Sequence, residues 1–175
     1  VKELDKASGV WSLNEQIDQQ DAGLWPKREA TIDYLVVGGG GAGGSELGSS
    51  TSSGGGGAGG YRSSGFGPSP LQGTAQSLGL GSYSVTVGAG GAALTSGSCT
   101  AAPGSGSNSI FGSITSAGGG GGGTTTPPGG GTAGASGGSG GGGKQGSPGG
   151  SGNTPPVDPP QCQPGGNAAA CCPYG

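Results

Sequence analysis

The sequence contains no histidine and no methionine, and large apolar residues are scarce. Leu, Ile, Val and Phe together make up about 13 % of the 175 residues, below the ~20 % that marks disordered chains. A conventional side-chain core cannot be built from so few residues. Without histidine, neither a Ser-His-Asp triad nor a Cys-His pair is available. We therefore expect no enzyme.

Charge is also sparse, at 9 % of residues with a net charge of −3. The basic residues are few and scattered, so a nucleic-acid interface is not expected. No apolar run approaches the ~20 residues that span a bilayer. Low charge also removes the self-repulsion that keeps many polar chains disordered.

Glycine is abundant, with 50 residues, and lacks the every-third spacing of collagen. Polyglycine forms a left-handed helix with three residues per turn and no internal hydrogen bonds. Its amides must pair with neighbouring segments or water. Several such helices side by side would order the chain; the alternative for residues 118–150 is a flexible linker. The purest tracts are 54–60, 118–123, 129–131 and 137–143.

The N-terminal segment has a different composition. The sequence Ser12-Leu-Asn-Glu15 fits a capping box and predicts a helix from Leu13 to Asp21, with Gly23 as its stop. So short a helix needs a partner surface. We expect it to dock on a partner protein or in a trimer core, although tryptophans could also stack on sugars. The docking residues are Trp11, Leu13, Ile17, Leu24 and Trp25.

Short stretches of alternating β-branched and aromatic residues predict a mainly β fold. In residues 31–37, Ile32, Tyr34 and Val36 share one face, and both faces are expected to be buried. Further strands are expected at 82–87 and 108–115, with short pieces near 60–63 and 71–80. The predicted architecture is a small β-sandwich or sheet with polyglycine II-like loops and a short N-terminal helix, and trimerisation would help it bury more surface.

Composition divides the chain into four parts: a helical docking segment, a glycine-rich β domain, a polyglycine segment and a Pro/Cys-rich tail. An even number of cysteines suits disulfides. Cys162 could pair with either Cys171 or Cys172, which leaves Cys99 or another chain for the remaining thiol. Zinc would require a fourth ligand and Cys-x-x-Cys-like spacing, so no metal is expected. The boundaries of the parts are 1–30, 31–117, 118–150 and 151–175.

Gly38, Gly40 and Gly43 fit a dinucleotide-binding fingerprint directly after a predicted strand. No amphipathic helix follows, and no acidic residue stands about twenty positions later to hold a ribose. In a chain this rich in glycine the spacing arises by chance. We therefore expect no cofactor.

Several stretches resemble bacteriophage structural proteins. Residues 7–16 and 22–26 look like the N-terminal segment of tail-fibre or virion proteins. Residues 33–44, 54–61, 83–91 and 108–119 are similar to the glycine-rich domain found in those proteins. The resemblance implies a β-rich domain displayed on the virion.

If the resemblance extends to function, the chain is a fibre or tail-tip adhesin that recognises a host surface glycan or outer-membrane protein. Loops tipped by Ser, Thr and Tyr61, together with Arg62, would contact the receptor. The alternatives are a capsid decoration or head-fibre protein and, less expected, a bacterial extracellular fibre protein.

Overall fold

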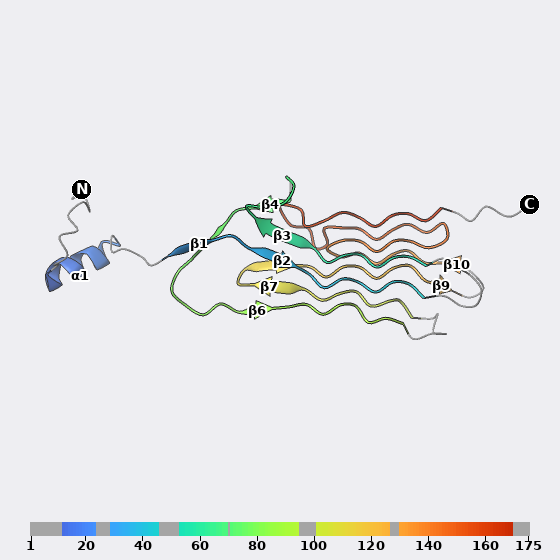
Figure 1. Ribbon diagram of the computed structural model, residues 1–175, viewed down its shortest axis with the longest axis horizontal. Coiled ribbons are helices and arrows are strands. Elements are labelled where there is room, and N and C mark those ends of the chain that lie inside the picture. Colours follow the sequence, from blue (N-terminus) through green and yellow to red (C-terminus); the bar gives the residue numbers. More distant parts are fainter. Residues whose placement is uncertain are drawn as a thin grey trace, which may run out of the picture.

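The computed structural model describes residues 12–23, 29–45, 53–69, 71–94, 101–126 and 130–169. Helix α1 (Leu13–Asp21) lies beyond one end of an elongated body and contacts none of the described strands (Figure 1). Ser12 and Glu15 form the predicted capping box, with the Glu15 amide donating to Ser12 Oγ at 3.3 Å. Gly23, at φ +67°, follows the helix in the left-handed conformation that a glycine stop adopts. The predicted helix is confirmed.

The strands are short and occupy the end of the body nearest α1. Sheets β2–β3–β4 and β6–β7–β8 pack face to face, while β1–β5 and β9–β10 are two-stranded. Every pair is antiparallel except β3 with β4. The mainly β architecture is confirmed. The strands are β1 (Ala30–Ile32), β2 (Leu35–Val37), β3 (Tyr61–Ser64), β4 (Gln72–Gly73), β5 (Gln76–Leu78), β6 (Val85–Thr86), β7 (Ser109–Phe111), β8 (Ile114–Ser116), β9 (Thr125–Thr126) and β10 (Gly130–Gly131).

The first predicted strand is interrupted, and one of its faces is open. Ser64 breaks it at Tyr34: the Tyr34 amide donates to Ser64 Oγ at 2.9 Å, and the Ser64 amide donates to the Tyr34 carbonyl at 3.0 Å. Val36 is buried between the two larger sheets. The expectation of two buried faces is wrong, because Leu35 and Val37 are 63 % and 48 % exposed.

The expected strand at 108–115 is in fact a hairpin. Gly112 adopts φ +55° and turns the chain, so that β7 pairs back with β8. The expected strand at 82–87 pairs only over Val85 and Thr86. The pieces expected near residues 60–63 and 71–80 are present as β3, β4 and β5.

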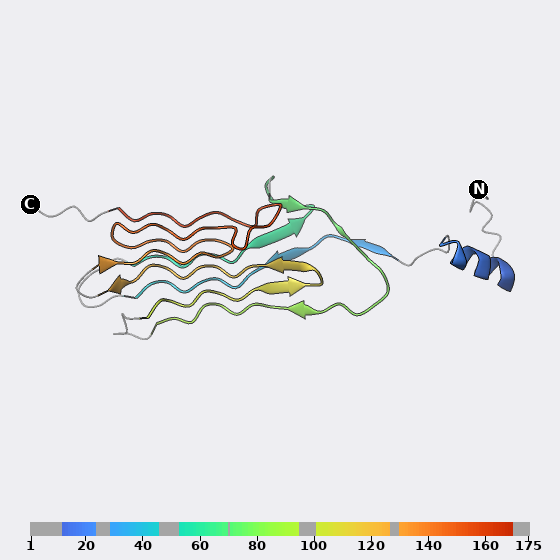
Figure 2. The ribbon, with the colours of Figure 1, turned by 180° about the vertical axis from the view of Figure 1, so that it is seen from behind.

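Away from these sheets the chain passes back and forth in extended glycine-rich runs, which we call the glycine array (Figures 1 and 2). Successive runs alternate in direction and lie side by side. Their hydrogen bonds repeat every third residue, as polyglycine helices require: the amides of Gly38, Gly41 and Gly44 donate to the carbonyls of Gly60, Gly57 and Gly54. The runs are 38–45, 53–60, 87–94, 101–108, 117–124, 131–136, 137–144, 147–151 and 161–169.

The run 117–124 is the centre of the array and is buried along its whole length. The amides of Gly119 and Gly120 donate in different directions, to the carbonyls of Gly39 at 2.8 Å and Ser139 at 2.9 Å. Its carbonyls in turn accept hydrogen bonds from other runs. The interior of the array is therefore made of main chain, which replaces the side-chain core that the sequence lacks.

Glycine is required in the array for space and not for conformational freedom. Positive φ occurs among the described glycines only in turns and at the helix end, outside the runs. A Cβ on Gly119 would lie 2.0 Å from the carbonyl oxygen of Gly57, and one on Gly120 would lie 1.8 Å from that of Ala135. By contrast, a Cβ on Gly55 would meet no atom within 4 Å. Inward positions therefore exclude any side chain, and outward positions accept one.

Main-chain hydrogen bonds unite the parts that composition separates. The array draws its runs from residues 38 to 169 and crosses the boundaries at 117/118 and 150/151. Within residues 118–150, the described positions 118–126 and 130–150 belong to this ordered array. The flexible-linker alternative is therefore wrong for these positions.

Candidate functional site

The glycine array has two chemically different ends. The proximal end carries the two larger sheets, and α1 lies beyond it; the distal end is where the runs turn back (Figure 1). Runs 38–45 and 53–60 are joined there, as are 87–94 with 101–108 and 117–124 with 131–136. Gln145 and Gly146 form a further turn at this end. Several runs therefore end and begin at this end of the array, far from α1.

Below the distal turns lies a group of hydroxyl side chains with one buried lysine. Lys144 is 2 % exposed, and its ammonium donates to the Thr125 hydroxyl. The Thr124 hydroxyl donates to the Ser45 carbonyl at 2.7 Å, and the Thr124 amide donates to Thr132 Oγ1 at 2.9 Å. These contacts tie neighbouring runs together just before they turn.

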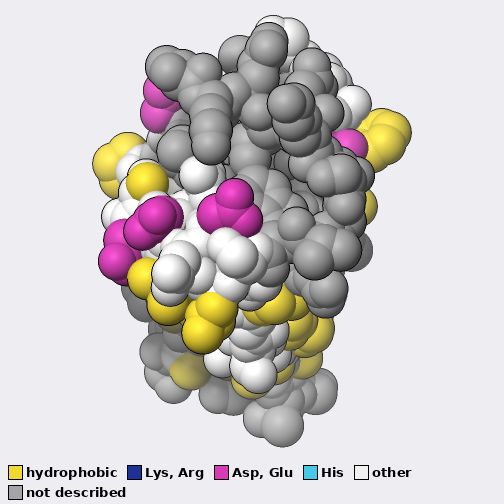
Figure 3. Space-filling view, turned by 90° about the vertical axis from the view of Figure 1, so that its left-hand side faces the viewer, with side chains coloured by type: hydrophobic (Ala, Val, Ile, Leu, Met, Phe, Trp, Pro, Cys, Tyr) yellow, Lys and Arg dark blue, Asp and Glu magenta, His cyan; other side chains and the backbone are white. Residues whose placement is uncertain are grey.

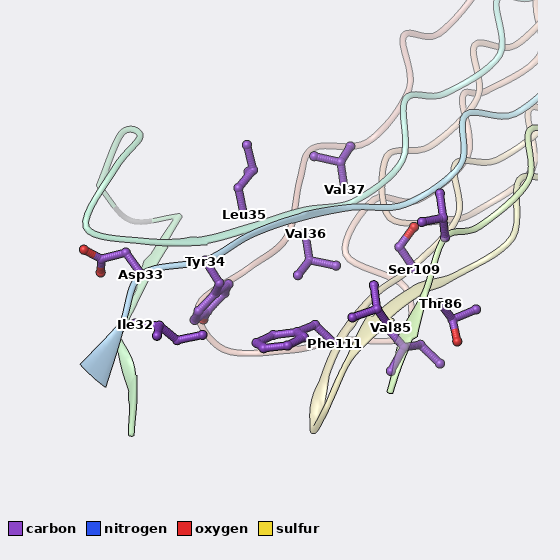
Figure 4. Close-up of a pocket in the computed structure, with 12 residues that line it drawn as sticks. Ile32, Asp33, Tyr34, Leu35, Val36, Val37, Val85, Thr86, Ser109 and Phe111 are labelled. Atoms are coloured by element: carbon purple, nitrogen blue, oxygen red, sulfur yellow. The ribbon is translucent and has the colours of Figure 1, made fainter. Parts of the chain in front are cut away.

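At the proximal end, an open apolar cavity of about 500 Å³ lies between β2 and the β6–β7 pair (Figure 4). Asp33 contributes the only carboxylate, and no basic side chain lines the cavity. Such a lining favours an apolar partner over a charged ligand. The lining residues are Ile32, Asp33, Tyr34, Leu35, Val36, Val37, Val85, Thr86, Val87, Ser109, Ile110 and Phe111.

The docking residues expected on the N-terminal segment are only partly described. Leu13 is 71 % exposed and Ile17 is 46 % exposed, one turn apart on the same face of α1. Trp11, Leu24 and Trp25 lie outside the described residues. Helix α1 thus presents an apolar face that no described strand covers.

Tyr61 and Arg62 lie in β3 and not in a loop. Both are half-buried, and the Tyr61 amide donates to the Gln161 carbonyl at 2.8 Å. Arg62 is opposite Val36 in the antiparallel pair. The structure therefore places both residues among the proximal sheets and away from the distal turns.

Cys162 is half-buried and carries no disulfide. Cys99, Cys171 and Cys172, its expected partners, lie outside the described residues. Over the part of the chain that is described, no group of three or more His, Cys, Asp or Glu side chains gathers in a way that could hold a metal ion. Within the same ranges, no helix has the length and apolar character needed to cross a membrane.

The amides of the dinucleotide-like segment already have main-chain partners. Gly38, Gly39 and Gly41 donate to the carbonyls of Gly60, Ser107 and Gly57 at 2.8–3.0 Å. The segment continues as a run of the array, whereas the fingerprint requires it to open an α-helix. These amides form the hydrogen bonds that hold neighbouring runs together.

The three-residue hydrogen-bond repeat and the clashes that any Cβ would cause define a fold that depends on glycine. The family described as "Glycine-rich domain" matches residues 20–173. The chain belongs to this glycine-rich domain family. The match extends through the proline-rich tail, as the array does through run 161–169. No curated protein and no solved structure matches the chain.

Two polar residues important to this glycine-rich domain were missed in the sequence. Gln161 is 1 % exposed and bonds to two other segments through its side chain, while Lys144 is buried at the distal end. Each is a long polar side chain that interrupts a tract of small residues. That contrast is the signal that could have identified them.

Proposed function

We propose that this glycine-rich domain is an adhesin on the surface of a bacteriophage virion, in a fibre or at the tail tip. The observation that carries the proposal is the separation of the two ends by the ordered array. One end leads to a helix with an uncovered apolar face, and the other gathers the turns between runs. A protein that binds a particle at one end and a cell at the other needs this arrangement.

The distal turns supply the proposed receptor surface. In sequence they include Ser45-Glu-Leu-Gly-Ser-Ser-Thr-Ser-Ser53 and Thr95-Ser-Gly-Ser-Cys-Thr100, which are rich in hydroxyl groups. Hydroxyls both donate and accept hydrogen bonds, which suits a host surface glycan or the polar loops of an outer-membrane protein. Affinity per copy would be low, and many copies would supply avidity.

The proximal end supplies the proposed anchor to other virion proteins or to a neighbouring copy. The described residues before Tyr34 include no Lys or Arg and five acidic residues, which are Glu15, Asp18, Asp21, Glu29 and Asp33. Figure 3 shows acidic side chains beside apolar ones on this end. A helix as short as α1 gains stability by packing this apolar face on a partner.

The test is to add the purified protein to host cells and to locate it on intact particles with gold-labelled antibody. We expect saturable binding to cells and label at the tail. Replacing the glutamate, serines and threonine of residues 46–52 with alanine should abolish cell binding while the thermal midpoint is retained. Tyr61→Phe, which removes only a hydroxyl from β3, should leave binding unchanged if the distal turns, and not β3, contact the receptor.

Deletion of residues 1–30 should prevent incorporation into particles but leave a folded domain that still binds cells. Normal incorporation of the deletion variant would reject the anchor. Many labelled copies over the capsid shell would indicate a decoration protein instead, and detection in uninfected cells would indicate a bacterial surface fibre.

A further inference from the structure

We propose that the proximal cavity is the docking site for helix α1 of a second copy of this chain. The proposal rests on the anchor part of the proposed function and names the surface involved. Two uncovered apolar surfaces of the chain lie at the same end of the molecule. They are the face of α1 with Leu13 and Ile17 and the cavity between β2 and β6–β7.

The rim of the cavity is unusually apolar for an exposed surface. Val85 and Val87 from the β6 segment are 68 % and 84 % exposed, and Leu35 and Val37, on the outer face of β2, are 63 % and 48 % exposed. The close-up shows Val36 and Phe111 on the inner side of β2, below the outward-pointing Leu35 and Val37 (Figure 4). Aliphatic side chains concentrated in this way mark a contact surface.

Helix α1 has the pattern that enters an apolar groove. Leu13 and Ile17 stand four residues apart and share one face, the spacing used by helices that dock in grooves. Asp21 lies one further turn along the same stripe, and Asp18 flanks it. The docking face therefore has an apolar part followed by an acidic end.

A positive charge on β3 indicates where the acidic end of a docked α1 would lie. Arg62 forms no ion pair with any described residue, and it is the only cation among the described residues of the proximal sheets. It is directly opposite Val36, which lines the cavity, so their Cβ atoms are about 5 Å apart. An acidic residue at the end of a docked helix would pair with this guanidinium.

A second copy fits better than the chain's own helix. In the structure the chain's own α1 lies beyond the proximal end, past β1 (Figure 1), and contacts none of the described strands. Helices exchanged between neighbouring copies make a head-to-tail contact, which forms a ring when the rotation from one copy to the next closes. Such a ring would direct all distal ends the same way and agrees with the expected trimer.

The experiment measures the mass of the purified full chain by sedimentation over a range of concentrations. We expect a concentration-dependent oligomer for the wild type and a monomer for Arg62→Glu and for Asp21→Arg. Combining the two reversals should restore the oligomer, since the pair is then rebuilt with opposite sign. Asp158→Arg, an exposed reversal on the loop before Gln161, is the matched control and should leave the oligomer intact.

A second measurement uses only wild-type chains and identifies which helix occupies the cavity, so it does not depend on whether the variants fold. In a mixture of isotope-labelled and unlabelled wild-type chains, nuclear Overhauser contacts between copies should join the Ile17 and Val85 methyl groups. The same contacts within a monomer would show that the chain's own helix docks, and their absence with an unfilled cavity would leave the site to another protein. Either result overturns the proposal. Loss of host-cell binding by an intact oligomer would reject only the adhesin function.

Discussion

The side chain of Gln161 joins the C-terminal run to the central run through Ala117, whose amide donates to Gln161 Oε1 at 2.8 Å. Gln161 Nε2 donates to the Pro155 carbonyl at 3.0 Å, and the main-chain amide of Gln161 donates to Asn153 Oδ1 at 3.2 Å. The buried side-chain amide of Gln161 thus links the tail to the central run, in addition to the main-chain hydrogen bonds that join the tail to other runs.

Replacing this amide should destabilise the domain. Gln161→Leu would leave the buried main-chain amide of Ala117 without a partner, so we expect the free energy of unfolding to fall by about 1–3 kcal/mol. Urea unfolding monitored by circular dichroism measures it. Gln163→Leu, two residues away and exposed, is the control and should change stability by less than ~0.5 kcal/mol. Equal midpoints for the two variants would contradict the proposed role of Gln161.

Alanine should be tolerated at outward glycines of the array and not at inward ones. Gly119→Ala places a Cβ 2.0 Å from a main-chain carbonyl, which cannot rotate away as a side chain could. We expect a loss of at least about 3 kcal/mol. Gly55→Ala meets open space and should change stability by no more than ~1 kcal/mol, in the stabilising direction, because alanine restricts the unfolded chain. Thermal midpoints compare the two, and similar losses would show that packing between runs does not set the glycine requirement.

Removing the buried charge at the distal end should not harm the fold. Lys144 is buried with a hydroxyl as its partner, so its ammonium loses hydration without a compensating carboxylate among the described residues. Lys144→Met keeps the length of the side chain, and we expect the free energy of unfolding to stay the same or to rise by up to about 3 kcal/mol. Lys144→Ala should lower it by about 2–4 kcal/mol through lost packing. Destabilisation by the methionine variant as large as that by alanine would mean that the charge itself stabilises the array.

Salt should have little effect on unfolding. Residues 63–143 contain no Asp, Glu, Lys or Arg at all, so the array offers sodium chloride almost no charge to screen. We expect the thermal midpoint to move by less than about 2 °C between ~0.05 and ~0.5 M sodium chloride. A shift of many degrees would place important ion pairs in segments beyond the described ranges.

Local signals in the sequence predict the local structure well. The Ser12–Glu15 capping box and Gly23 define α1 to the residue, because helix ends depend on contacts a few residues apart. The strand at Leu35–Val37 follows from its β-branched residues. The hairpin at Gly112 was missed because β-branched and aromatic residues stand on both sides of this glycine, and only its positive φ reverses the chain.

The partners of the runs could not be predicted. In a β-sheet, the pattern of apolar side chains identifies the buried face and fixes the register. Glycines 118 to 123 are identical in sequence, yet the amides of Gly119 and Gly120 donate to different runs. With no side chains to distinguish these positions, the map of neighbours is set by distant features such as Gln161 and the proximal sheets.

For the proximal cavity, too, local structure was predictable and its assembly was not. The apolar residues of β2 and β6 were visible as strands, but their shared cavity requires the two sheets to meet. The exposure of Leu35 was unexpected because the sequence shows which residues are apolar and not which of them remain uncovered.

The three-residue repeat also bears on how such domains change length. Inserting one turn, about 9 Å of chain, into every run at the same level would preserve each main-chain hydrogen bond and move the distal turns outward as a unit. Insertions of one or two residues would rotate inward glycines to outward positions and bring side chains against carbonyls. Related domains should therefore differ in reach by whole triplets matched across neighbouring runs, so that the distance between their two ends changes in fixed steps.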